Sequence, residues 1–170
     1  MEFTLTQYFP TGLDRLWAVF GRPDYPHRKY EALGTTALRL HRFHVTAQAI
    51  DVELERDVPV DQSRLPAWVG KMIDRKQSLR HHTQWRRISP TEVSAELHIS
   101  PIGLPVHAHG VGTIIETAPG TTRMVLAWRV TSTLPLIGDK VERLFADQLR
   151  SALDDDHAFT LQYLQQMSSD

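Results

Sequence analysis

One stretch decides the fold: GDKVERLFADQLRSALDDDHAFTLQYLQQM, residues 138–167. After Gly138 it contains neither proline nor glycine, and its apolar residues recur every three or four positions, which is the period of one face of an α-helix. At about 1.5 Å per residue the helix would reach roughly 40 Å, enough to cross a whole sheet. The apolar face must be buried against that sheet. It consists of Val141, Leu144, Phe145, Leu149, Ala152, Leu153, Phe159, Tyr163, Leu164 and Met167.

The chain before this helix has the pattern of strands. Residues 2–9, EFTLTQYF, alternate in the period of a strand. Two short helices follow, one ending at Gly21 and one running from Pro23 to Gly34. Six further strands are predicted over residues 36–45, 48–58, 77–88, 92–100, 106–117 and 123–134.

Two of these strands carry opposite charges on their polar faces. The strand over 48–58 has an acidic row, and the strand over 77–88 has a basic one; the rows are Asp51, Glu53, Glu55 and Asp57, and Arg80, His82 and Arg86. If the strands pair antiparallel, opposite charges meet, at roughly 0.2–1 kcal/mol per pair. This pairing explains the basic residues without nucleic acid. The formal net charge of −1 also lacks the positive surplus that phosphate binding usually needs.

Composition sets further limits on the class of protein. The 170 residues fit one domain, 1–170, with 41% hydrophobic and 23% charged residues. With no cysteine, the chain has neither a disulfide framework nor a thiolate nucleophile. We find no signal peptide, no run long enough to span a membrane and no nucleotide or phosphate fingerprint, and we expect a cytoplasmic protein without an integral membrane segment.

The order of elements, together with several motifs, resembles a known superfamily. The motifs are VPV at 58–60, LPAWVGKMI at 65–73, QW at 84–85 and LPLIGDKVERL at 134–144. On these the chain resembles the START/Bet v 1-like (SRPBCC) superfamily, and within it a bacterial branch known only as a domain of unknown function. The resemblance implies an α+β helix-grip fold, in which a seven-stranded antiparallel sheet curves around the long C-terminal helix and two short helices lie between the first two strands.

The resemblance also implies a cavity between sheet and helix for a hydrophobic small molecule such as a lipid or polyketide, without a cofactor. Apolar residues dominate the faces that would line it, as in ordinary small-molecule pockets. The candidate ligand-binding residues are His81, Trp85, His107, His109, Trp128, Leu149, Asp156, Phe159 and Tyr163. The same residues would also serve to fill a core. Asp156 either reaches solvent at the flank of the helix or enters the enclosed space.

The orientation of three histidines, His81, His107 and His109, determines whether the cavity could support acid/base catalysis or metal binding. His81 shares a strand face with Leu79 and Trp85, so we expect it to point inward. Neither face of the strand carrying His107 and His109 is clearly polar; we place both inward, although a glycine bulge would switch their side. Zinc held by these histidines and Asp156 is disfavoured because no local ligand motif accompanies them, and we predict no metal.

Two alternatives to ligand carriage stay open. A cyclase or aromatase, as in parts of the superfamily, would use the cavity histidines as acid and base, with Asp156 or Tyr163 assisting. A protein-interaction module would present Trp17 and Trp68 as exposed aromatics. The connection over 59–76, with Leu65, Trp68, Val69, Met72 and Ile73, is either a lid over the cavity mouth or a plain packing segment.

Overall fold

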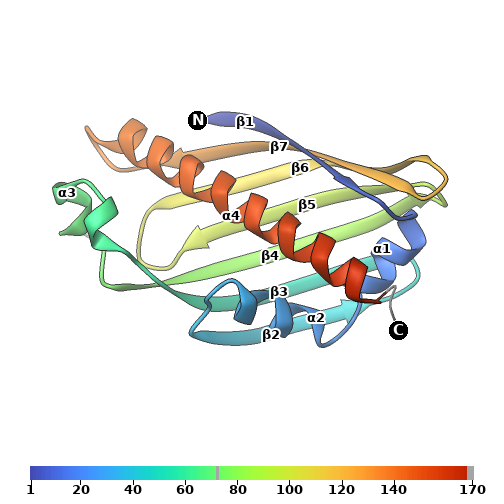
Figure 1. The fold of residues 1–170 in the computed structure, drawn as a ribbon. Coiled ribbons are helices and arrows are strands. Elements are labelled where there is room, and N and C mark those ends of the chain that lie inside the picture. The colour runs from blue at the N-terminus through green and yellow to red at the C-terminus, as the bar shows by residue number, and fades with distance from the viewer. Residues whose placement is uncertain (72, 168–170) are drawn as a thin grey trace.

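The computed structural model describes residues 1–71 and 73–167, and a single antiparallel sheet organises them (Figure 1). Its seven strands are β1 (Glu2–Phe9), β2 (Ala37–Val45), β3 (Ala49–Pro59), β4 (Lys76–Ser89), β5 (Glu92–Pro101), β6 (Val106–Ala118) and β7 (Thr121–Ser132). The strand order is β1-β7-β6-β5-β4-β3-β2. Every strand after β2 lies beside its predecessor in sequence, whereas β1 closes the far edge against β7.

Helices gather on one face of this sheet. The long helix α4 crosses it diagonally, and α1 and α2 lie beside the C-terminal half of α4 (Figure 1). A short 3₁₀ turn, η1, and the single turn α3 occupy the connection between β3 and β4. The helix bounds are α1 (Leu13–Phe20), α2 (Tyr25–Ala32), η1 (Gln62–Arg64), α3 (Ala67–Gly70) and α4 (Gly138–Met167). The predicted helix-grip fold is confirmed, with the second helix beginning at Tyr25 rather than Pro23. None of the helices within 1–71 and 73–167 is long and apolar enough to cross a membrane.

Charge complementarity fixes one side of the sheet, as predicted. Glu55 of β3 lies opposite Arg80 of β4, whose Nη2 is 2.8 Å from the Glu55 carboxylate. On its other side, β3 meets the basic residues of β2, where Arg39 pairs with Asp57 at 3.0 Å. The acidic row of β3 is therefore neutralised from both neighbouring strands, and these charges lie on the face away from α4.

Two glycines in β6 allow close packing beneath α4. A Cβ at Gly110 would lie 2.7 Å from the Trp128 ring, and one at Gly112 would collide with the Val125 carbonyl group. The indole of Trp128, 1% exposed, can cover β6 only because Gly110 has no side chain. Phe3 stacks on that indole with ring centroids 6.3 Å apart, which ties β1 to the same layer.

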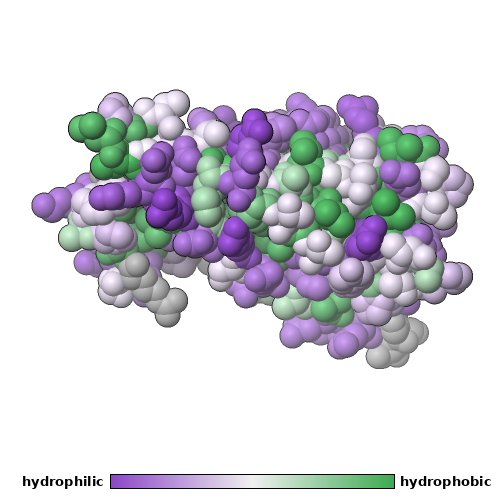
Figure 2. Space-filling view, turned by 90° about the horizontal axis from the view of Figure 1, so that it is seen from above, coloured by the Kyte–Doolittle hydropathy of each residue, from purple (hydrophilic) through white to green (hydrophobic). Residues whose placement is uncertain are grey.

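The prediction that Trp17 is an exposed aromatic is wrong. Trp17 is 8% exposed rather than open to a partner, because α1 packs its indole against Trp85. Its Nε1 donates to the Thr46 carbonyl at 3.3 Å, and the Arg87 guanidinium lies 4.7 Å from its ring centroid. Elsewhere on the surface, Figure 2 shows hydrophobic residues in small groups separated by hydrophilic ones over the face it presents.

Candidate functional site: a cavity between sheet and helix

A cavity of about 530 Å³ lies between the sheet, α4 and the β3–β4 connection. That volume is within the range of pockets that enclose drug-sized small molecules. Most of its lining is apolar and comes from elements far apart in sequence. Its larger apolar side chains include Phe20, Leu79, Trp85, Leu97, Met124, Leu126, Phe145, Leu149 and Leu153. Burying apolar surface of a ligand here would contribute roughly 25 cal/mol per Å² removed from water.

The β3–β4 connection supplies a wall of the cavity. Leu65, Trp68, Val69 and Ile73 all line it. The connection is closed at its base, where the Val60 amide donates to the Arg75 carbonyl at 2.8 Å. The β3–β4 connection therefore lies where a lid over the cavity would lie. That it opens and closes to admit a ligand stays a prediction. Met72, included in the predicted lid, lies outside the described residues.

An ion pair joins the wall of α2 to α4. Lys29 of α2 places Nζ 2.9 Å from Oδ2 of Asp156, and the Lys29 side chain is only 11% exposed. Burial is the largest single effect and acts to lower the pKa of Lys29, but the Asp156 carboxylate together with Tyr30 and Tyr25 outweighs it, so the net pKa is raised. The Lys29 ammonium group also lies 4.6 Å from the Tyr30 ring centroid. Lys29 is therefore a cation with its counter-ion in place.

Arg56 of β3 is a second buried cation, and it lacks such a partner. The residue is 8% exposed, its Nε donates to Nε2 of His81 at 3.0 Å, and its Nη1 donates to Thr35 Oγ1 at 3.3 Å. Neither bond uses Nη2. Its guanidinium carbon lies 4.7 Å from the Tyr30 ring centroid. Within 1–71 and 73–167, no carboxylate lies within ion-pair distance of Arg56.

His81 is held neutral beside Arg56. Burial, followed by the positive charges of Arg56 and Lys29, lowers the pKa of His81 well below its usual range. Since Nε2 accepts the Arg56 hydrogen, the ring proton must be on Nδ1. The lone pair that a general base would need is therefore already engaged.

The buried polar wall thus carries two cations and one carboxylate. Lys29 and Arg56 are positive, Asp156 is negative and His81 is neutral, so the wall has an excess of one positive charge. Asp61 and Asp155 also line the cavity, but both are exposed to solvent. An uncompensated buried charge is costly, and a bound anion would offset that cost.

Four predicted site residues come together around the cavity: His81, Trp85, Leu149 and Asp156. Asp156 takes neither of the extremes considered for it, since its side chain is 27% exposed and paired with Lys29.

The remaining predicted residues lie elsewhere. Phe159 and Tyr163 pack around Tyr25 at centroid distances of 5.9 and 5.3 Å, next to the cavity but outside its lining. Trp128 belongs to the core above Gly110.

The predicted inward orientation of His107 and His109 is wrong. β6 keeps a regular register with β5 from Ala108 to Ile115, so no bulge changes its parity there. The buried side of β6 consists of small or apolar residues such as Ala108 and Ile114. His107 is exposed, and His109 contacts Glu96 on the outer face of the sheet. Neither histidine lines the cavity.

Sequence reasoning missed Lys29, Tyr30 and Arg56. A signal for Arg56 was present, because it shares strand parity with Leu54 and Val58 and is the one charged residue within that apolar row. A charged residue in an otherwise buried apolar row is unusual, and here the Arg56 side chain lines the cavity.

The fold defines the class of protein, and comparison with solved structures agrees. The chain is similar to TTHA0849 from Thermus thermophilus, with a TM-score of 0.60 and 13% identity over 100% of both chains. It is similar to a START superfamily protein from Mycobacterium smegmatis (TM-score 0.51, 14% identity, 96% of this chain and 98% of that one). It is also similar to norcoclaurine synthase from Thalictrum flavum (TM-score 0.56, 10% identity, 95% and 86%). The protein has the START/Bet v 1-like fold, and the predicted resemblance is confirmed.

Within that class, the particular family follows from sequence. Residues 4–164 match the family described as "Protein of unknown function (DUF2505)", and the chain belongs to this family. No curated protein matches the chain in sequence. Because the solved structures share so little sequence identity with it, they establish the fold alone.

Proposed function

We propose that this protein binds a hydrophobic small molecule that carries a carboxylate. The observation that carries the proposal is Arg56, a buried guanidinium in the wall of a mainly apolar cavity, without a carboxylate partner among the described residues. The apolar body of the ligand would lie along α4, and its carboxylate would accept a hydrogen bond from Arg56. Planar carboxylates match the geometry of guanidinium donors better than that of ammonium groups.

Two probes of equal chain length test both parts of the proposal. Binding of decanoate and of 1-decanol is measured by displacement of an uncharged apolar dye. The cavity predicts that both bind, and Arg56 predicts that decanoate binds about 10- to 100-fold more tightly, as expected for a hydrogen bond to a charged group. If neither probe binds, the cavity is not a ligand site. Equal binding of both would leave the cavity but remove the role of Arg56.

Substitution assigns the effect to one side chain. Arg56→Gln should weaken decanoate binding about 10- to 100-fold while leaving decanol binding nearly unchanged. Arg42→Gln is the matched control, because Arg42 is an exposed arginine of β2 paired with Asp51 at 3.3 Å. Native mass spectrometry of freshly purified protein then identifies any co-purifying acid. An uncharged lipid as the sole occupant would contradict the carboxylate assignment.

The geometry favours this binding role over the acid/base alternative. His81 is the one histidine of the predicted set that lines the cavity, and its Nε2 lone pair accepts from Arg56. Asp156, the other proposed participant, is paired with Lys29. The interaction-module alternative gains no support either, because Trp17 is buried and Trp68 lines the cavity.

A further inference from the structure

Three histidines form a row across the outer face of the sheet, on the side away from the cavity. His82 of β4 lies opposite His98 of β5, and His98 lies opposite His109 of β6. The rings of His98 and His109 are nearly parallel, at 10° and with centroids 4.2 Å apart. His82 stands further off, at 6.4 Å from His98, and its Nε2 contacts Asp51 at 2.9 Å.

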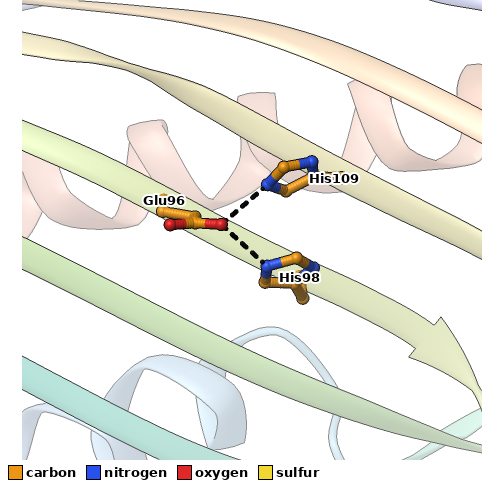
Figure 3. Close-up of side chains that lie close together, drawn as sticks. All are labelled: Glu96, His98 and His109. Carbon is orange, nitrogen blue, oxygen red and sulfur yellow. Dashed lines mark hydrogen bonds and ion pairs between the residues drawn. The ribbon is translucent and has the colours of Figure 1, made fainter.

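Glu96 completes a cluster with two of these histidines. It precedes His98 by two residues on β5, so both side chains emerge from the same face of the strand. A single carboxylate oxygen of Glu96 lies 3.2 Å from His98 Nε2 and 3.0 Å from His109 Nε2 (Figure 3). One ligand atom from each of the three residues falls within 4.8 Å of the others.

We propose that Glu96, His98 and His109 bind one divalent transition-metal ion, with Zn²⁺ as the best fit. Tetrahedral zinc has bonds of about 2.0–2.1 Å to nitrogen and about 2.0–2.2 Å to oxygen, which places neighbouring ligand atoms roughly 3.3–3.5 Å apart. The two oxygen–nitrogen distances in the cluster are only slightly shorter. The ion would replace two hydrogen bonds after small movements of exposed side chains, and water would complete the coordination.

The strands pre-organise these ligands. His98 and His109 are held opposite one another by the β5–β6 pairing, so binding does not require ordering of a loop. Their side chains are 52% and 44% exposed, which gives an ion direct access from solvent. Arg129 lies opposite His109, but its Nε is paired with Glu2 at 2.8 Å.

The type of ligand sets the type of metal. Two imidazoles with one carboxylate suit zinc, copper, nickel or iron, whereas magnesium and calcium prefer all-oxygen sites. The H-x-H sequence of β6 is not the chelating unit: His107 stands apart, and the partner of His109 comes from the neighbouring strand.

Calorimetric titration of the untagged chain with Zn²⁺ tests the site, with Co²⁺ absorption as a second readout. We expect one Zn²⁺ per chain, visible d–d bands for Co²⁺ that Zn²⁺ removes, and no heat from Mg²⁺. His98→Ala and Glu96→Gln should each weaken Zn²⁺ binding by at least about tenfold.

His107→Ala is the matched control, because His107 is an exposed histidine of β6, the strand that carries His109, and lies outside the cluster. It should leave Zn²⁺ binding unchanged, and thermal unfolding of all three variants confirms that they are folded. Equal loss in His107→Ala and His98→Ala would overturn the site, as would wild-type binding no tighter than that of His98→Ala. One ion per two chains would overturn the proposal that a single chain supplies all three ligands.

Discussion

His81 accepts a hydrogen bond from the buried guanidinium of Arg56 at 3.0 Å, so each of these two buried polar side chains satisfies a hydrogen-bonding group of the other. The neutral ring gives the cation an acceptor without cancelling its charge. The pair therefore keeps a positive charge available to the cavity, and its stability cost should be measurable.

His81→Leu should destabilise the protein by about 1–3 kcal/mol, because it leaves the Arg56 Nε hydrogen buried without an acceptor. The double variant Arg56→Met/His81→Leu should recover that loss or exceed wild-type stability, since it removes the buried charge as well. Urea unfolding measures both. A double variant less stable than the single one would show that Arg56 stabilises the unliganded fold.

The Lys29–Asp156 pair should matter for stability. Asp156→Asn leaves the Lys29 ammonium group largely buried without its counter-ion, at a cost of about 1.5–3 kcal/mol. Asp155→Asn is the control, because Asp155 is the neighbouring carboxylate and is exposed. Thermal unfolding of the two variants at neutral pH separates them. Equal effects would mean that the α2–α4 ion pair contributes nothing specific.

Asp57 should make stability depend on acid pH. The Arg39 guanidinium, followed by Ser78, holds the pKa of Asp57 well below its usual range. A carboxyl group with a depressed folded-state pKa contributes stability above its unfolded pKa of about 3.9 and loses it as pH falls further. Asp57→Asn should therefore lower the melting temperature at pH 7, and the difference from wild type should shrink below about pH 4. A difference that stays constant with pH would contradict this role.

Gly110→Ala should destabilise the protein by about 1–3 kcal/mol, because the new methyl group meets the buried Trp128 ring. Gly70→Ala serves as the control, since a Cβ there has no neighbour within 4 Å. Urea unfolding compares them. Partial rescue of Gly110→Ala by Trp128→Leu would show that the destabilisation comes from a steric clash between the new methyl group and the Trp128 ring. If Gly110→Ala costs no stability, β6 can shift away from Trp128.

Hydrogen exchange tests the β3–β4 connection. If it opens to admit a ligand, amides over 62–71 should exchange much faster than those of β5, and decanoate should slow them. Protection equal to that of the central strands, with or without decanoate, would identify a fixed wall.

Much of the fold could be predicted because it rests on local periodicity. The thirty residues of α4 and the alternating strands keep their pattern in the structure. The orientation of β6 could not be predicted: between Val106 and Ile114 its buried side consists of Ala108, Gly110 and Gly112, which carry little hydrophobic signal, while the exposed Val111 looks like core. The partnership of Arg56 with His81 needed the pairing of β3 with β4 and the position of α2, which periodicity does not supply.

The edge pairing of β1 with β7 has a consequence for folding. Phe3 can meet Trp128 only after 128 of the 170 residues have been synthesised, and the Met1 ammonium group can reach Glu142, at 2.8 Å, only later still. Contacts this distant in sequence slow folding, because a long loop must close before they form. During synthesis β1 therefore stays unpaired until β7 has been made. A nascent chain that stalls before residue 121 would expose the apolar face of the sheet, which the complete fold buries.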